Sequence, residues 1–155
     1  LLSRAGFAVE RMQYFEGHSI FIHARPASTA PVSGACPSGS GGARQLREFL
    51  AEGYRDARSL RARVDREADR SVFLFGAHVF SQFLLSAGLG ESGISGVLDN
   101  DPAKQGKRLY GTGLQVLAPA DIADVDDCAV IVRAAHYTDE IVTQLKSIRT
   151  EIKIW

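Results

Sequence analysis

Continuous apolar runs alternate with amphipathic stretches through most of the chain. Five short runs are predicted to be strands: residues 71–75, 94–98, 114–117, 129–133 and 151–155. Stretches with apolar residues at three- and four-residue steps are predicted to be helices: residues 44–70, 78–87 and 138–148, with a brief helix at 118–121. Strand and helix patterns therefore alternate from residue 44 onward.

This alternation predicts an α/β fold. Apolar runs without polar alternation are typical of strands buried on both faces, hence of a parallel sheet covered by helices. Right-handed crossovers favour the spatial order 3-2-1-4-5, with the five strands numbered along the chain. We therefore expect a Rossmann-like parallel sheet with flanking helices, in which the winding direction changes between the first and fourth strands.

The first 43 residues have a different pattern. FAVERMQYF and HSIFIHARP predict two short antiparallel strands, a hairpin that precedes the sheet. Residues 26–43, PASTAPVSGACPSGSGGA, consist almost entirely of small residues and helix breakers, which predicts a flexible linker. Because two strands cannot form a core, we interpret residues 1–25 as the tail of a domain and 44–155 as the Rossmann-like domain.

Composition narrows the function classes. Lys and Arg total 18 and Asp and Glu total 18, which gives no indication of a nucleic-acid partner. No apolar run approaches the ~20 residues of a membrane span, so we expect no membrane partner. Neither Cys36 nor Cys128 has a cysteine neighbour at metal-binding spacing, so we expect no zinc site and a cytoplasmic protein.

Two loops at predicted carboxyl ends of strands are candidate ligand-binding segments. Gly76, Ala77 and His78 follow the first strand of the sheet, and His136 and Tyr137 follow the fourth. In the predicted strand order both loops face the crevice where the winding direction changes. Each histidine has two interpretations, a cap of the following helix or a ligand contact, and the sequence leaves both open.

Charged residues near these loops extend the candidate site. Asp99 ends the second strand about 20 residues after the glycine loop, where an acid binds a ribose diol, but Asp-Asn-Asp-Pro is also a good turn. Lys104 forms a small basic cluster with Lys107 and Arg108, which suits either a solvated surface or a phosphate-facing loop. Arg133 ends an apolar strand and is expected to meet a ligand phosphate or an acid such as Asp99.

Several motifs together resemble a known family. VLDNDPAKQGKRLYGTGLQV, a hydrophobic strand and YTDEIVTQL resemble the C-terminal domain of the sugar C-methyltransferases, which depend on S-adenosylmethionine. The matching positions are Gly76-Ala77, Asp99 with Pro102, Lys104, Gln105 and Gly106, Gly111-Thr112, and Asp139-Glu140-Ile141. The segment GFAVERMQYFEGHSIFIHARP resembles the last two strands of the methyltransferase domain that precedes it in these enzymes.

The resemblance implies a part in methyl transfer to a nucleotide-linked deoxysugar. It implies a nucleotide-sugar and an upstream methyltransferase domain as partners, with a homodimer left open. S-adenosylmethionine would be the cofactor of the full-length enzyme and bind outside this chain, which by itself would bind no cofactor and be inactive. His78-Val79-Phe80 replaces a Lys-Gly pair of the family, and Ala135-His136-Tyr137 replaces a Trp-Asn pair. Because of these departures the substrate is not carried over. The family's catalytic residues belong to regions that these residues do not include, so no catalytic residue is carried over either.

Other functions fit the same residues. The domain could serve only for docking or dimerisation, in which case the isolated chain would dimerise and ignore nucleotides. It could also be the nucleotide-sugar-binding module of another sugar-modifying enzyme, such as an acyltransferase, but the chain contains no hexapeptide repeats. A redox enzyme that uses NAD is disfavoured, because the second and third glycines of the dinucleotide fingerprint are missing.

Overall fold

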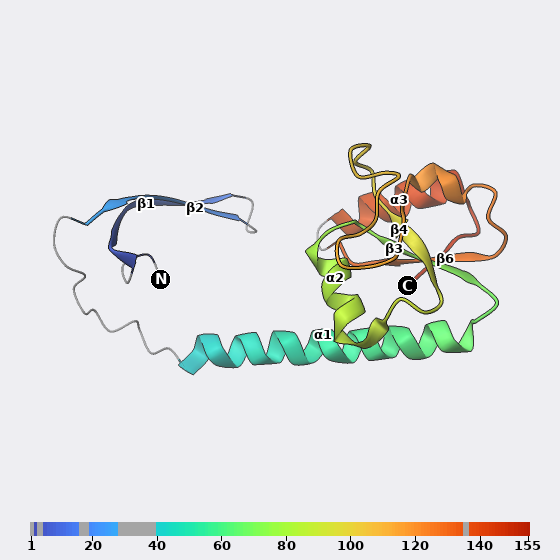
Figure 1. The fold of residues 1–155 in the computed structure, drawn as a ribbon, viewed down its shortest axis with the longest axis horizontal. Helices are drawn as coiled ribbons and strands as arrows, with labels where there is room; N and C mark the ends of the chain where they lie inside the picture. Colours follow the sequence, from blue (N-terminus) through green and yellow to red (C-terminus); the bar gives the residue numbers. More distant parts are fainter. Residues whose placement is uncertain (1, 3–4, 16–18, 28–39, 135–136) are drawn as a thin grey trace. The chain divides into compact units, whose positions relative to one another are not determined.

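A computed structural model describes residues 2, 5–15, 19–27, 40–134 and 137–155. The chain divides into two compact units, Leu1–Ala43 and Arg44–Trp155. The first unit holds two strands, β1 (Phe7–Phe15) and β2 (Ser19–Pro26). The second unit holds the parallel sheet and the helices that cover it (Figure 1).

The hairpin of the first unit has one apolar and one polar face. A β-bulge between Val9 and Arg11 shifts the register of β1 by one residue. As a result, apolar residues pair with apolar residues on one face: Phe7 with Pro26, Val9 with Ala24, Met12 with Ile22, and Tyr14 with Ile20. On the polar side Glu10 forms ion pairs with Arg25 and His23, at 2.6 and 3.2 Å. The predicted antiparallel pair is confirmed, and the bulge keeps Arg11 off the apolar face.

The second unit is an α/β domain with a five-stranded parallel sheet, as predicted. Its strands are β3 (Ser71–Phe75), β4 (Ile94–Leu98), β5 (Val116–Leu117), β6 (Cys128–Val132) and β7 (Lys153–Ile154). They are arranged β5-β4-β3-β6-β7, and every neighbouring pair is parallel. In chain order of these five strands this arrangement is 3-2-1-4-5, so the winding direction changes between β3 and β6.

Helices cover both faces of this sheet (Figure 1). They are α1 (Ser40–Arg66), α2 (Val79–Leu84), the π-helical turn η2 (Leu85–Leu89), the short 3₁₀ helix η3 (Pro119–Ile122) and α3 (Thr138–Ile148). Val72 and Leu74 face a core formed with α1, α2 and η2, while Phe73 and Phe75 face a core formed with α3 and η3. Burial on both faces explains the continuous apolar run of β3.

Both ends of α1, predicted at residues 44–70, differ from the prediction, and the helix ends at Arg66. Helix α1 begins at Ser40, so residues 40–43, predicted to be linker, are helical; elongating an existing helix is easy even through glycine, whereas starting one is not. The helix after β3 is interrupted at Gly88, as predicted, because the φ of this residue is +126° and not helical; η2 continues to Leu89, and Gly90 follows it. None of the helices in the described ranges is long and apolar enough to cross a bilayer.

Candidate functional site

The loop after β3 is held in place by its own hydrogen bonds. The Gly76 N–H donates to the Leu98 carbonyl at 2.7 Å, and the buried Ser81 hydroxyl donates to the Gly76 carbonyl at 2.6 Å. Gly76 has φ +98°, and a Cβ at this position would lie 2.3 Å from Nε2 of His78. The fold itself therefore requires glycine here, whether or not a phosphate approaches the loop.

His78 caps helix α2. Its Nδ1 accepts a hydrogen bond from the Phe80 N–H at 3.1 Å, which requires that Nδ1 carry no proton. Burial lowers the pKa of His78, the nearby Lys104 lowers it further, and Asp99 opposes both effects. The ring is thus kept in the neutral form that the cap needs, which supports the capping interpretation. The same side chain also lines a cavity, so a ligand contact remains a prediction.

Asp99 joins three segments of the site. Its Oδ2 accepts the Ala77 N–H at 2.6 Å and the Lys104 ammonium at 3.1 Å, and its Oδ1 accepts the Asp101 N–H at 2.9 Å. The residue is only 7% exposed. Burial raises the pKa of Asp99, but the hydrogen bonds and Lys104 lower it more, so the net pKa lies below the ordinary value. These contacts favour the turn interpretation of Asp99 over ribose binding.

Backbone N–H groups of the β3 loop are already used within the protein. Those of Gly76, Ala77 and Phe80 donate to Leu98, Asp99 and His78 respectively. An anion that approached this loop would therefore have to be bound mainly by side chains. Within the described ranges no three His, Cys, Asp or Glu side chains gather in a way that could hold a metal ion.

Basic side chains gather in a cavity of about 220 Å³ beside this loop. Its charged lining residues are Lys104, Lys107 and Arg108, the neutral imidazole of His78 lies beside them, and no acidic side chain lines it. In the part of the chain that the structure describes, Lys107 and Arg108 form no ion pair, whereas Lys104 is paired with Asp99. The loop is fixed at its base, where the Gly106 N–H donates to the Val116 carbonyl at 2.9 Å. The arrangement is suited to an anionic ligand.

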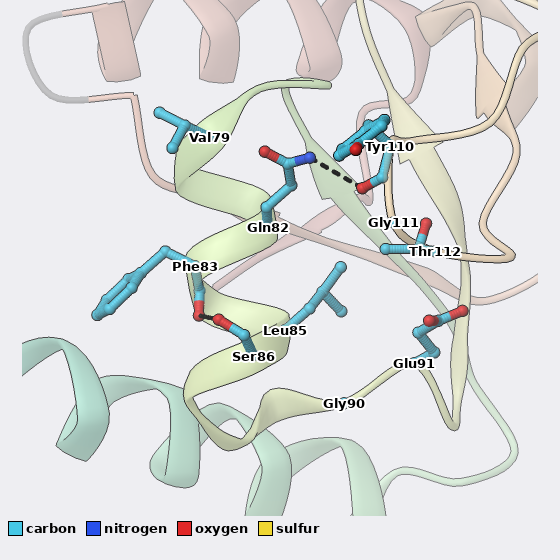
Figure 2. A pocket seen from close by; sticks show the side chains of 10 residues that line it. All are labelled: Val79, Gln82, Phe83, Leu85, Ser86, Gly90, Glu91, Tyr110, Gly111 and Thr112. Atoms are coloured by element: carbon cyan, nitrogen blue, oxygen red, sulfur yellow. Dashed lines mark hydrogen bonds between the residues drawn. The ribbon is translucent and has the colours of Figure 1, made fainter.

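A larger cavity of about 570 Å³ lies between α2 and the loop that contains Tyr110 (Figure 2). Gln82 and Tyr110 line both cavities, and the Gln82 side-chain amide donates to the Tyr110 carbonyl at 2.8 Å. Neither residue is among the predicted site residues. An aromatic residue shortly after Lys107 and Arg108 was a signal that could have pointed to the loop.

Arg133 lies elsewhere than expected. Its Nε donates to Oδ2 of Asp56 on α1 at 3.2 Å, and its Nη1 donates to the carbonyls of Val132 and Trp155, each at 3.0 Å. Arg133 thus meets an acid, as one of the two expectations held, but this acid is Asp56 rather than Asp99. The reason is that α1 packs across the sheet beside β6 and presents an acid there. Arg133 lines a separate cavity of about 180 Å³.

The predicted meeting of the two histidine loops stays a prediction, because the second loop is only partly described. Tyr137 is exposed at the start of α3, where its N–H donates to the Ala134 carbonyl at 3.0 Å. None of the three cavities is lined by both His78 and Tyr137. His136 lies outside the described residues. The structure thus brings together Gly76, Ala77, His78, Asp99 and Lys104, and pairs Arg133 with Asp56.

Comparison with known proteins assigns the second unit to a family. No curated protein sequence gives a significant match to the chain. Residues 44–154 match the family described as the C-methyltransferase C-terminal domain. The matched range runs from α1 to β7 and contains the β3 loop, Asp99 and the basic cavity. The chain therefore belongs to the C-methyltransferase C-terminal domain family.

Proposed function

We propose that residues 44–155 bind a nucleotide-linked sugar and position it for methylation by a C-methyltransferase. The observation that carries this proposal is the cavity lined by His78, Lys104, Lys107 and Arg108, which has no acidic lining residue. The family supports a role within a C-methyltransferase. The diphosphate is the part of a nucleotide-sugar that such a cavity would bind.

Charge and geometry suit a diphosphate. Lys107 and Arg108 have no carboxylate partner among the described residues, so a ligand would not have to break an ion pair to reach them. Arginine binds phosphate through two parallel hydrogen bonds, and lysine supplies a compact positive charge. The interaction energy of two opposite unit charges 4 Å apart is roughly 1 kcal/mol in water and roughly 4 kcal/mol near a protein surface. Both side chains are exposed, so the lower figure applies.

The same residues do not suit S-adenosylmethionine. In a nucleoside site of this fold, the acid after the second strand accepts hydrogen bonds from the ribose hydroxyls. Here both carboxylate oxygens of Asp99 already accept hydrogen bonds, and the side chain is nearly enclosed. We propose that the methyl donor binds in another part of the enzyme, and no step of methyl transfer is assigned to these residues.

Titration calorimetry with dTDP and UDP tests the proposal. The double variant Lys107→Ala/Arg108→Ala should bind the nucleotide at least about tenfold more weakly, and its affinity should depend less on salt. Arg66→Ala/Lys146→Ala removes the same charge from exposed positions that line none of the three cavities, and should bind like the unaltered chain. Absence of binding to both nucleotides, or equal affinity of the two double variants, would refute the proposal.

A second candidate function, docking, is favoured by the hairpin of the first unit. The apolar face has several exposed large side chains, among them Met12, Tyr14, Ile20 and Ile22. A two-stranded hairpin is marginally stable unless such a face is covered. The resemblance of this segment to the end of a methyltransferase domain makes that domain the proposed partner. The alternative is that a second copy of the chain covers this face. Size-exclusion chromatography with light scattering tests this dimerisation, and a chain that stays monomeric at all concentrations would exclude it.

A further inference from the structure

Tyr110 is the most exposed large hydrophobic residue of the described chain, at 87%. Single exposed apolar residues are common on protein surfaces and need no explanation by themselves. Tyr110 differs because it lies where the two cavities meet and lines both of them. Its position therefore suggests contact with a ligand that spans the two cavities.

The backbone that carries Tyr110 is fixed. The Leu109 N–H donates to the Leu114 carbonyl at 2.9 Å, and the Thr112 N–H donates to the Leu109 carbonyl at 3.1 Å. Leu109 and Leu114 are buried, and the Gln82 amide holds the Tyr110 carbonyl from α2. The exposed ring thus stands on a turn tied to the core on both sides. A ligand that stacked on it would order one side chain and no backbone.

The wall that α2 and η2 contribute is mixed, with Val79, Phe83 and Leu85 as its apolar residues and Gln82 and Ser86 as its polar ones. Leu85 points toward the loop with Tyr110, while Glu91 and Thr112 lie at the far end of the cavity (Figure 2). Glu91 already accepts the N–H of Gly113 through Oε2 at 2.8 Å, which leaves Oε1 for a donor on a ligand. A planar group with a few polar edge atoms suits this lining, because its face can stack on the ring of Tyr110 while its edge meets polar side chains such as Glu91.

We propose that the larger cavity takes the nucleobase of the bound nucleotide, with the ring of Tyr110 stacked on the base. The inference rests on the proposed function, because it needs the diphosphate in the basic cavity next to it. Every nucleobase has a π face, so stacking supplies affinity for any nucleoside diphosphate. Polar groups at the far end of the larger cavity would then discriminate between bases. Among the lining residues, Glu91 supplies the charged group.

Calorimetric titrations with two probes separate this inference from the proposed function. dTDP carries a base and a diphosphate, and inorganic pyrophosphate carries only the second. Tyr110→Ala should weaken dTDP binding about tenfold and leave pyrophosphate binding unchanged. Tyr110→Phe keeps the ring and should bind dTDP like the unaltered chain. Because the side chain is 87% exposed, both variants should fold, which circular dichroism and urea unfolding will check.

The outcomes are distinguishable. If neither dTDP nor pyrophosphate binds to the unaltered chain, the proposed function fails, and this inference fails with it. If both bind and Tyr110→Ala changes the two affinities equally or not at all, the base does not stack on Tyr110, and only this inference is overturned. If Tyr110→Ala binds glucose 1-phosphate more weakly than the unaltered chain does, but binds dTDP equally well, the sugar occupies the larger cavity. That result would also overturn this inference.

Discussion

Replacement of Gly76 by alanine tests how the β3 loop is built. A Cβ at this position would lie 2.3 Å from Nε2 and 2.6 Å from Cδ2 of His78, closer than any real contact, at a φ of +98°. The imidazole would have to move, and its Nδ1 would lose the hydrogen bond from the Phe80 N–H that caps α2. We expect Gly76→Ala to destabilise the chain through both effects.

The magnitude follows from these two terms. An alanine at positive φ costs roughly 1–2 kcal/mol, and loss of a helix N-cap costs about 1 kcal/mol, so the free energy of unfolding should fall by about 2–3 kcal/mol. Gly111→Ala is the matched control, because Gly111 has φ +77° but nothing within 4 Å of its Cβ position. Gly111→Ala should therefore lower the free energy of unfolding only by the roughly 1–2 kcal/mol that an alanine at positive φ costs. Urea unfolding followed by circular dichroism measures both values.

A double-mutant cycle isolates the contact with the imidazole. In a His78→Ala background the ring and its cap are already gone, so Gly76→Ala should cost only about 1–2 kcal/mol, as Gly111→Ala does. Equal penalties for Gly76→Ala in the presence and absence of His78 would refute the reasoning. So would a Gly76→Ala penalty no larger than that of Gly111→Ala.

Two further predictions concern charged side chains. Burial raises the pKa of Asp99, but its hydrogen bonds and Lys104 bring the net pKa below the ordinary value. The ionised form of Asp99 should therefore stabilise the fold fully above the unfolded pKa of about 4, and this stabilisation should be lost as pH falls through the folded pKa. Urea unfolding should show the difference in unfolding free energy between the unaltered chain and Asp99→Asn shrinking over the same pH range. A difference that does not change with pH would contradict the prediction. Arg133→Ala should lower the free energy of unfolding, measured in urea, by about 2 kcal/mol, and Asp56→Ala should lower it by less than about 1 kcal/mol. The reason for the difference is that Arg133 also donates a hydrogen bond to the Trp155 carbonyl. Equal losses in the two variants would contradict this prediction.

The sheet could be predicted because its signal is local to each strand. From Val72 to Phe75 of β3 the residues that face the two cores alternate, so each of these positions is apolar, and the same holds along β6. Right-handed crossovers then leave few possible strand orders. The start of α1 could not be predicted in the same way. Residues 40–42, a serine and two glycines, have poor helix propensity, and they are helical because they extend a helix established by the residues that follow.

The roles of the site residues depended on contacts between distant segments. Asp-Asn-Asp-Pro suits both a turn and a ribose site, and what favours the turn is the Ala77 N–H, 22 residues away in the sequence. Arg133 was expected to need a partner, but which acid it met depended on how α1 crosses the sheet. Tyr110 was missed because nothing in its sequence neighbours indicates that its ring stays exposed between two cavities.

The enclosed carboxylate of Asp99 has a consequence for how this domain changes over generations. It ties together the β3 loop, the turn after β4 and Lys104, while Lys107, Arg108 and Tyr110 are all exposed. If these three residues bind the ligand as proposed, substitutions there would alter what is bound without disturbing what holds the loops together. Ligand preference could then drift while the scaffold stays intact, and a search for new specificities should begin at these three positions.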